Sequence, residues 1–321
     1  MMESTKQNIL DYPFSDLYLS SDKAYMTGAK MDPNPTIVPE HLQEQAKELF
    51  LLCKDAAADQ KKDELTLSFQ ETIFRASLLE SLSETIYVLR RMAKSVLSLE
   101  ALKFPASYIN ILSQKELTGL VIVAGPFGSG KTTTASAILE KRLRLFGGVG
   151  ISIEDPPEMP LEGKHGNGIC YQTWAEQDSF AAATRKAARW APDIIYLGEV
   201  RDAETAIEAL KASIMRLVIC TTHSDGIETA LERIYTLASS QGLPDDISGL
   251  LANGLSCVIH QELKQHGQEI YPSIKFLWTR GEGSTRIRQL IKARNFKNLG
   301  SEIQEQLNQM MIKDRQRKKA D

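Results

Sequence analysis

The sequence lacks the features that define several protein classes. No apolar run in its 321 residues approaches the roughly 18 that a membrane-spanning helix needs. The 4 cysteines are scattered and form no Cys-x-x-Cys pair, so neither a structural zinc site nor a disulfide framework is indicated. The stretch from Met1 to Asp16 is mixed and polar, unlike a secretory signal. These absences predict a cytoplasmic protein with reduced cysteines.

Strong charge of one sign is also absent. The chain has 38 basic and 41 acidic residues, a formal net charge of −3, which gives no support to broad electrostatic binding of nucleic acid. It contains no LSGGQ segment, which argues against an ABC transporter. What is present is the composition of a globular protein, with 42% hydrophobic and 25% charged residues. Its length is about twice that of one typical domain, so we expect two domains.

Residues 1–103 have the mixed pattern of an α+β domain. The predicted elements are a strand at Ser15–Ser20, a helix at Glu40–Ala57, a hairpin of Leu65–Phe69 with Ile73–Leu78, and a strand at Glu84–Arg90. Residues 104–118, around Pro105, are interpreted as a linker into the next domain.

Residues 119–280 show a different pattern, in which short apolar runs alternate with helices. The runs are Leu120–Ala124, Val149–Ile153, Ile194–Leu197 and Leu217–Cys220. Unbroken apolar strands are typical of a parallel sheet that helices cover on both faces, so we predict one α/β domain here. Residues 281–321 are predicted to be helical and to end in a solvated basic tail, KDRQRKKAD.

A glycine-rich loop follows the first of these apolar runs. Its residues, GPFGSGKT from Gly125 to Thr132, fit the G-x-x-x-x-G-K-[ST] pattern of a phosphate-binding loop. The loop opens a predicted helix, Thr132–Phe146, which the glycine pair 147–148 ends. The glycines let backbone N–H groups face phosphates at the positive end of the helix dipole. Lys131 would neutralise the β- and γ-phosphates, and the Thr132 hydroxyl would ligate Mg²⁺.

The sequence therefore predicts a site for ATP and Mg²⁺. The loop residues expected to contact ATP are Gly125, Pro126, Phe127, Gly128, Ser129, Gly130, Lys131, Thr132 and Thr133.

Carboxylates follow two other predicted strands. Glu199 ends the segment PDIIYLGE, while Glu154, Asp155 and Glu158 lie in the segment EDPPE. Because the carboxyl ends of parallel strands meet at the crevice where ligands bind, these side chains should lie near the phosphates. We predict that Glu199 is the general base for water and that Glu158 joins the catalytic set. Glu154 and Asp155 are expected, with Thr132, to hold Mg²⁺.

One histidine and several arginines complete the predicted site. His223 follows a third strand and should lie at the same sheet edge, as a sensor or phosphate contact. Arg185 and Arg189 are four residues apart on a predicted helix, Asp178–Trp190, and hence on one face. Arg75 and Arg90 lie on predicted strands of the first domain. Surface charge is the default for an isolated arginine. Phosphoryl transfer favours an arginine supplied by a neighbouring domain or subunit, so contact of these arginines with ATP is carried as a hypothesis.

These motifs, in this order, resemble those of the secretion ATPase superfamily, which includes type II secretion ATPases, type IV secretion traffic ATPases and type IV pilus assembly and retraction motors. GPFGSGKTTT resembles the family's Walker A motif, ISIEDPPE its Asp box, APDIIYLGEVRDAETAIEAL its Walker B motif, and CTTHS its His box. The resemblance places Glu199 on the catalytic glutamate and His223 on the His-box histidine. It also places Arg75 and Arg90 on positions that approach the nucleotide from the N-terminal domain.

The resemblance implies a smaller, PAS-like α+β domain joined to a RecA-like P-loop core. It implies a cytoplasmic homohexamer that binds ATP between its domains, near a subunit boundary. The implied partner is the inner-membrane platform protein of a pilus or secretion machine, so contact with the membrane would be peripheral. The implied activity is ATP hydrolysis that drives pilus dynamics, protein secretion or conjugation.

The length and the segment STRIRQLIKARN (Ser284–Asn295) resemble the pilus-retraction and type IV secretion branch. One turn departs from the family pattern. Met215 and Arg216 stand where relatives carry a Thr-Gly-His turn. Two alternatives remain open. One is a regulatory nucleotide-binding scaffold with little turnover. The other is a RecA-like DNA motor, against which the acidic net charge argues.

Overall fold

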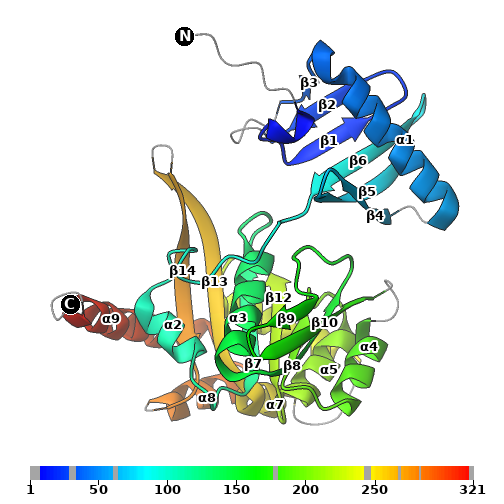
Figure 1. The fold of residues 1–321 in the computed structure, drawn as a ribbon. Helices are drawn as coiled ribbons and strands as arrows, with labels where there is room; N and C mark the ends of the chain where they lie inside the picture. Colours follow the sequence, from blue (N-terminus) through cyan, green and yellow to red (C-terminus); the bar gives the residue numbers. More distant parts are fainter. Residues whose placement is uncertain are drawn as a thin grey trace. The chain divides into compact units, whose positions relative to one another are not determined.

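The computed structural model of the chain describes residues 8–28, 34–60, 64–175, 180–241, 247–266, 269–281 and 283–317. The chain divides into two compact units, residues 1–94 and 95–321, and each is described by itself (Figure 1). Within the described ranges, no helix combines the length and the apolar character that crossing a bilayer requires.

The first unit is built on a six-stranded antiparallel sheet in the order β3-β2-β1-β6-β5-β4. Its elements are η1 (Ile9–Asp11), β1 (Asp16–Leu19), β2 (Ala24–Thr27), β3 (Thr36–Ile37), η3 (Glu40–Leu42), α1 (Gln43–Gln60), β4 (Glu64–Phe69), β5 (Thr72–Glu80) and β6 (Thr85–Arg91). Side chains alternate along β4, where Leu65 and Leu67 are buried and Thr66 is exposed. Leu49 and Cys53 of α1 share the same buried cluster, so this helix covers the apolar face of the sheet.

The second unit contains an eight-stranded sheet in the order β14-β13-β7-β12-β11-β8-β10-β9. The six inner strands run parallel, and the edge strands β14 and β9 are antiparallel to their neighbours. The strands are β7 (Gly119–Gly125), β8 (Gly148–Glu154), β9 (Gly163–His165), β10 (Gly168–Trp174), β11 (Ile194–Leu197), β12 (Leu217–His223), β13 (Leu255–His266) and β14 (Glu269–Trp278). The helices are α2 (Ala106–Leu112), α3 (Lys131–Phe146), α4 (Phe180–Arg189), α5 (Ala203–Ser213), α6 (Ile227–Ser239), α7 (Ile247–Gly254), α8 (Ser284–Lys292), η4 (Phe296–Leu299) and α9 (Gly300–Arg317).

Helices cover both faces of this sheet, so its inner strands are apolar throughout. Every residue of β7 is buried. Leu120 and Ile122 pack in the cluster that includes α5 and α6, whereas Val121 and Val123 pack in the cluster that includes α2 and α3. A strand with two buried faces needs apolar residues at successive positions, which explains the unbroken runs in the sequence.

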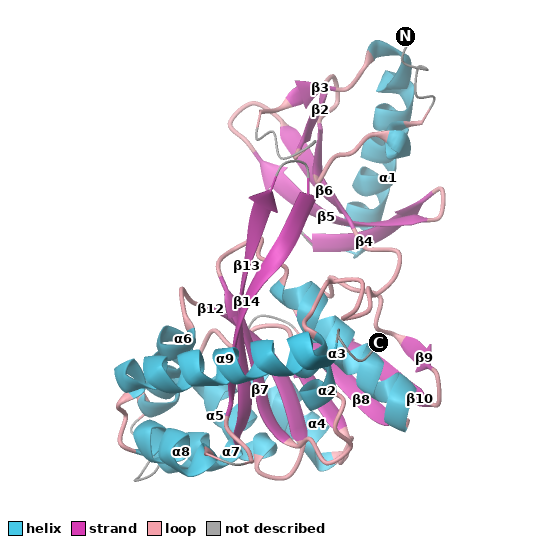
Figure 2. Cartoon of the chain, turned by 90° about the vertical axis from the view of Figure 1, so that its left-hand side faces the viewer, coloured by secondary structure: helices cyan, strands magenta, loops and turns pink. Residues whose placement is uncertain are grey.

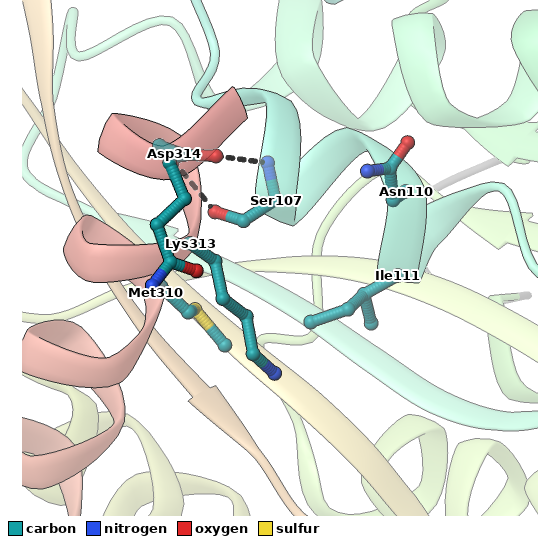
Figure 3. A pocket seen from close by; sticks show the side chains of 7 residues that line it. Ser107, Asn110, Ile111, Met310, Lys313 and Asp314 are labelled. Carbon is teal, nitrogen blue, oxygen red and sulfur yellow. Dashed lines mark hydrogen bonds between the residues drawn. The ribbon is translucent and has the colours of Figure 1, made fainter. Parts of the chain in front are cut away.

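Helix α9 lies against β14 and α2 (Figure 2). The N-cap residue of α2, Pro105, has no side-chain acceptor for the first N–H groups of the helix. Asp314 of α9 supplies the missing acceptor, because its carboxylate accepts hydrogen bonds of 2.9 Å from both the backbone N–H and the hydroxyl of Ser107 (Figure 3). The side chains around this contact line an open pocket of about 470 Å³.

The other end of α2 is held by Arg142 of α3. The Arg142 guanidinium donates hydrogen bonds to the carbonyl oxygens of Leu112, Gln114, Lys115 and Leu117, at 2.9, 2.8, 3.4 and 3.3 Å. Arg142 is 6% exposed, and burial lowers its pKa to about 10. Both ends of α2 are therefore fixed by side chains from distant parts of the sequence.

The organisation differs from the sequence prediction in three respects. The units divide at Lys94 rather than at residue 103, and residues 104–118 are part of the second unit instead of a linker. They contain α2, whose side chains Tyr108 and Leu112 are buried in the core of that unit. The hairpins β9–β10 and β13–β14 were not predicted either.

Residues 281–321 are helical as far as they are described, and residues 318–321 of the basic tail lie outside the described residues. Ile287 and Leu299 are buried, so α8 and η4 belong to the core of the second unit. The expected fold class, an α/β RecA-like P-loop core with a smaller α+β N-terminal domain, is confirmed.

Candidate nucleotide-binding site

The glycine-rich loop connects the carboxyl end of β7 to the first turn of α3. Gly130, the N-cap residue of α3, has φ of 81°, a left-handed conformation that favours glycine. Gly125 lies so close to β13 that a Cβ atom there would be 2.2 Å from the carbonyl oxygen of Gln261. These two positions explain why the loop requires glycine at both of its ends.

The loop has the properties of an anion-binding site. Gly130 offers no side chain to the first N–H groups of α3, which remain available at the positive end of the helix dipole. The hydroxyl of Ser129 is buried and has no hydrogen-bond partner among the described residues. Unused donors at a helix N-terminus fit a phosphate group.

Lys131 lies inside this loop and is 7% exposed. Its ammonium group donates a 2.8 Å hydrogen bond to the carbonyl oxygen of Pro126 and lies 3.2 Å from Nδ1 of His223. Burial lowers the pKa of Lys131, while the nearby carboxylates of Glu199 and Glu158 oppose this shift. The lysine is thus held between the loop and the end of β12.

His223 ends β12 directly beside Gly125 in the parallel register and connects Lys131 to Glu199. Its Nε2 atom lies 3.5 Å from Oε1 of Glu199. Burial and the positive charge of Lys131 lower the pKa of His223, which favours the neutral imidazole. An ammonium group can only donate, so Nδ1 accepts from Lys131 and the ring proton on Nε2 faces Glu199.

The ring of Phe127, a residue of the loop, lies against the Lys131–His223 pair. Its ring centroid is 3.8 Å from that of His223, and the Lys131 ammonium lies 5.8 Å from the Phe127 ring. The side chain of Phe127 is otherwise 86% exposed. The aromatic ring therefore shields one side of the imidazole.

The backbone on either side of Glu199 is anchored to neighbouring strands. The N–H of Gly198 donates to Ile153 of β8 at 2.9 Å, and the N–H of Val200 donates to Thr221 of β12 at 3.0 Å. The Glu199 carboxylate also accepts a 2.8 Å hydrogen bond from Nε of Arg201. Glu199 is thereby held at the carboxyl edge of the sheet, as predicted for a residue that follows a buried parallel strand.

Glu154 was predicted to be a ligand of Mg²⁺, but its environment differs from that of an accessible ligand. It is 2% exposed, and its Oε1 atom accepts hydrogen bonds of 2.9 Å from Ser152 Oγ and from Gln172 Nε2. Its Oε2 atom lies 3.4 Å from the backbone N–H of Glu158. Burial raises the pKa of Glu154, although these hydrogen bonds oppose the shift. Both oxygens are already in use, so Glu154 is suited to shaping the acidic loop rather than to holding a cation.

The other two acidic residues of this loop are more accessible. Asp155 is half-buried, and its Oδ1 atom accepts a 2.9 Å hydrogen bond from the indole N–H of Trp174. Glu158 is exposed and influences the pKa of Lys131. Among the described residues, no group of three or more His, Cys, Asp or Glu side chains is arranged to hold a metal ion. Mg²⁺ usually binds one or two protein oxygens together with substrate phosphates, and half-buried Thr132 and Asp155 fit that requirement.

Three of the four predicted arginines pair with carboxylates of their own unit. Arg185 of α4 pairs with Glu208 of α5 at 3.6 Å, and Arg189 is exposed on the same helix. In the first unit, Arg75 pairs with Glu64 at 2.9 Å. Arg90 faces Arg75 from the neighbouring strand and pairs with Asp16 at 2.7 Å. Asp178 and Ser179, at the start of the predicted helix Asp178–Trp190, lie outside the described residues.

A cavity of about 230 Å³ adjoins the phosphate loop and was not predicted from the sequence. Its lining includes Gly130 and Thr133 of the loop and α3, the apolar side chains Leu102, Leu263 and Pro272, and Gln261. Gln261 also lay outside the sequence prediction. Nothing in the sequence distinguishes it, because it lies between two other polar residues, His260 and Glu262.

The parallel sheet, the loop between β7 and α3 and the acidic strand ends define a P-loop nucleotide-binding protein with a RecA-like core. The sequence pattern of the type II/IV secretion system proteins matches residues 58–312. The chain therefore belongs to this family, which confirms the resemblance found in its motifs.

The relatives include proteins of type IV pili. The chain is 38% identical over 168 residues to the type IV pilus ATPase PilU of Pseudomonas aeruginosa, covering 50% of this chain and 42% of PilU. It is 35% identical over 179 residues to a twitching motility protein of Neisseria gonorrhoeae, covering 55% of this chain and 46% of that protein. The matched region thus spans less than half the length of either relative.

Solved structures share the fold. The pilus retraction motor PilT with bound ADP has a TM-score of 0.73 at 24% identity, covering 92% of this chain and 87% of that chain. The ATPase DotB of Yersinia pseudotuberculosis has a TM-score of 0.68 at 19% identity, covering 94% and 84%. Both chains are matched over most of their length, so the likeness extends to the fold as a whole.

Proposed function

We propose that the chain hydrolyses ATP to drive a type IV pilus or a type II/IV secretion or conjugation machine. The observation that carries this proposal is the series of contacts from Lys131 through His223 to Glu199, at 3.2 and 3.5 Å. It brings a cation for the phosphates and a carboxylate for water to one edge of the sheet. Phosphoryl transfer requires these two functions.

Each side chain has a role that its position supports. Lys131 would exchange its hydrogen bond with the Pro126 carbonyl for one with a phosphate oxygen. Glu199, held by its anchored backbone, would orient the attacking water and accept its proton. His223 would sense the γ-phosphate through Lys131. When bound, ATP supplies the phosphoryl group and Mg²⁺ shields its charge, with Thr132 and Asp155 as the protein ligands.

The nucleoside end of ATP would occupy the cavity beside the loop. That cavity borders Gly130 and Thr133, which follow directly from the phosphate-binding residues. Apolar side chains such as Leu102 and Leu263 suit the faces of a purine ring. This assignment explains why the segment around residue 102 packs close to the loop.

The assembly and its partners are proposed by analogy with the relatives. PilU is named as a pilus ATPase, and PilT as a pilus retraction motor. By analogy, this chain would form a cytoplasmic homohexamer that acts on an inner-membrane platform protein and contacts the membrane only through partners. In such a ring, Arg75, Arg90, Arg185 and Arg189 are the candidates to reach a nucleotide from a neighbouring domain or subunit.

The test measures ATP binding and turnover for the wild type and three variants. Lys131→Ala should abolish binding of Mg²⁺-ATP, because it removes the cation from the loop. Glu199→Gln should retain binding and lower turnover by roughly 10²- to 10⁴-fold, the usual contribution of a general base. Lys115→Ala, an exposed lysine away from the loop, is the control and should behave like the wild type.

Three outcomes would decide against the proposal. Turnover no faster than that of Lys131→Ala would exclude an ATPase. Tight ATP binding without turnover, unchanged in Glu199→Gln, would instead indicate the regulatory scaffold. DNA-stimulated turnover with a steep dependence on salt would indicate a DNA motor.

A further inference from the structure

Gln261 connects β13 to the phosphate loop through its side-chain amide. It is 3% exposed, and its Nε2 group donates a hydrogen bond to the carbonyl oxygen of Ser129. Its Oε1 atom accepts a 2.7 Å hydrogen bond from the hydroxyl of Thr134, in the first turn of α3. A carbonyl oxygen can only accept, so the Ser129 contact fixes which end of the amide faces the loop. Both ends of the Gln261 amide are therefore satisfied.

The backbone of Gln261 is equally close to the loop. In the parallel pairing of β13 with β7, His260 lies beside Ala124, so Gln261 lies next to the start of the loop. A Cβ atom on Gly125 would meet the Gln261 carbonyl oxygen at 2.2 Å, and one on Gly130 would meet its Nε2 atom at 2.9 Å. Gln261 thus touches both ends of the loop from a strand that contributes nothing to the loop sequence.

These contacts determine how one peptide group of the loop is oriented. The carbonyl of Ser129 and the N–H of Gly130 belong to the same planar peptide and point in opposite directions. Because Gln261 binds the carbonyl, the Gly130 N–H is turned away from β13. Thr134 would otherwise be free to bond to the carbonyl of its own helix turn, but its hydroxyl is directed to Gln261 instead.

We propose that Gln261 is a positioning residue that holds the phosphate loop in its anion-binding shape and thereby sets the affinity for the nucleotide phosphates. The inference rests on the proposed nucleotide binding and adds a residue from outside the loop. Gln261 would act on the phosphates through its hydrogen bonds with Ser129 and Thr134. A loop that is already in shape loses less conformational entropy when the ligand binds.

The experiment measures the affinity for Mg²⁺-ATP by calorimetry on the full chain. Gln261→Leu keeps a side chain of similar size but removes both hydrogen bonds, and affinity should fall about tenfold or more. The matched control is Gln306→Leu. Gln306 of α9 also bridges two backbone groups, the N–H and carbonyl of Trp278, both at 2.8 Å. Its variant should bind ATP with an affinity within about twofold of the wild type.

A second variant distinguishes positioning of the loop from a general loss of structure. Gln261→Glu keeps the shape of the side chain, but its carboxylate repels the Ser129 carbonyl and only its protonated form can donate. The affinity of this variant relative to the wild type should therefore rise as the pH falls, because burial favours protonation. Thr134→Val combined with Gln261→Leu should be no weaker than Gln261→Leu alone, because both changes remove the same hydrogen bond.

The outcomes separate this inference from the proposed function. Wild-type affinity in Gln261→Leu, with binding lost in Lys131→Ala, would overturn the role of Gln261 and leave the nucleotide site intact. If Gln261→Leu does not fold, a relative affinity of Gln261→Glu that is independent of pH would overturn it. Failure of the wild type to bind Mg²⁺-ATP would overturn the proposed function, and the inference with it.

Discussion

Lys131 and His223 share a hydrogen bond, and their surroundings determine where the proton lies. Burial lowers the pKa of both groups, and Lys131 lowers that of His223 further. Glu199 opposes both shifts. The neutral imidazole is thus the form that fits the site. Protonation of His223 would place two cations 3.2 Å apart, so the contact depends on a pH at which the histidine is uncharged.

A second histidine lies on β13, beside the last residues of β7. His260 of β13 is 1% exposed, and its Nε2 atom has no hydrogen-bond partner among the described residues. Burial lowers its pKa, whereas Glu262 and a hydrogen bond to the backbone of Ser224 oppose the shift. Lys275 lowers the pKa further, and Asp225 raises it. The largest of these effects is burial, so the folded state favours neutral His260.

The pH dependence of stability should reveal His260. Its folded-state pKa lies below the ordinary value of 6.5, so the unfolded chain takes up a proton first on acidification. The free energy of unfolding should therefore fall as the pH drops below 6.5 and be unaffected by this group above it. His260→Gln retains a donor for Ser224 but does not titrate, so it should lose less stability between about pH 7.5 and about pH 5.5.

Urea unfolding followed by tryptophan fluorescence measures this effect. All 3 tryptophans, Trp174, Trp190 and Trp278, belong to the second unit, so the signal reports on the unit that contains His260. Equal losses of stability in the variant and the wild type over this pH range would show that His260 does not contribute.

At the scale of elements, α2 depends on side chains from two other helices. A helix of seven residues is too short to be stable alone, so tertiary contacts must hold it. Asp314 of α9 caps its first turn, and Arg142 of α3 binds the carbonyls at its end. The stacked rings of Tyr108 and Phe276, with centroids 4.6 Å apart, join α2 to β14. The segment expected to be a linker is therefore a structural part of the second unit.

Removal of the cap should destabilise the second unit. Asp314→Ala leaves the Ser107 N–H without its acceptor, and the free energy of unfolding should fall by about 1 kcal/mol, as for other helix caps. The measurement is the same tryptophan-monitored urea titration. Lys313→Ala, at an exposed neighbouring position, is the control and should change stability by less than about 0.5 kcal/mol. An unchanged midpoint in Asp314→Ala would show that water replaces the cap.

At the scale of the whole molecule, the first unit contributes two arginines that face each other on neighbouring strands. In the single chain, Arg75 and Arg90 pair with carboxylates of their own sheet, Glu64 and Asp16. One member of each pair is open to solvent, Glu64 at 40% and Arg90 at 63% of the side chain. Solvent weakens such pairs, so the arginines can exchange these partners at modest cost. The assembly would decide whether they reach a nucleotide.

The prediction for the assembly concerns turnover. Arg75→Ala and Arg90→Ala should each lower the ATP turnover number by at least about tenfold without changing the size of the proposed homohexamer. The reason is that an arginine that stabilises the transition state contributes to kcat and not to assembly. Turnover and light scattering are measured together. Lys54→Ala, on the exposed surface of α1, should leave both unchanged. Unchanged turnover in both arginine variants would show that these side chains only form ion pairs within their own sheet.

The sequence by itself determined the local parts of the nucleotide site. The loop from Gly125 to Thr132 is encoded by backbone conformation and helix capping, and these depend on neighbouring residues in the chain. The apolar runs before Glu199 and His223 likewise revealed buried parallel strands, so their placement at the sheet edge could be predicted. The order of the motifs was sufficient to indicate the family.

Only the tertiary structure decided which distant residues meet at these parts. Gln261 is 132 positions from Ser129, and Asp314 is 207 positions from Ser107. No periodicity relates such pairs, because the packing of strands and helices sets their distances. The same packing buried Glu154, which the sequence predicts as a ligand of Mg²⁺, and gave it hydrogen bonds from Ser152 of β8 and Gln172 of β10. Burial and long-range partners thus separate the residues that support the site from those that face the ligand.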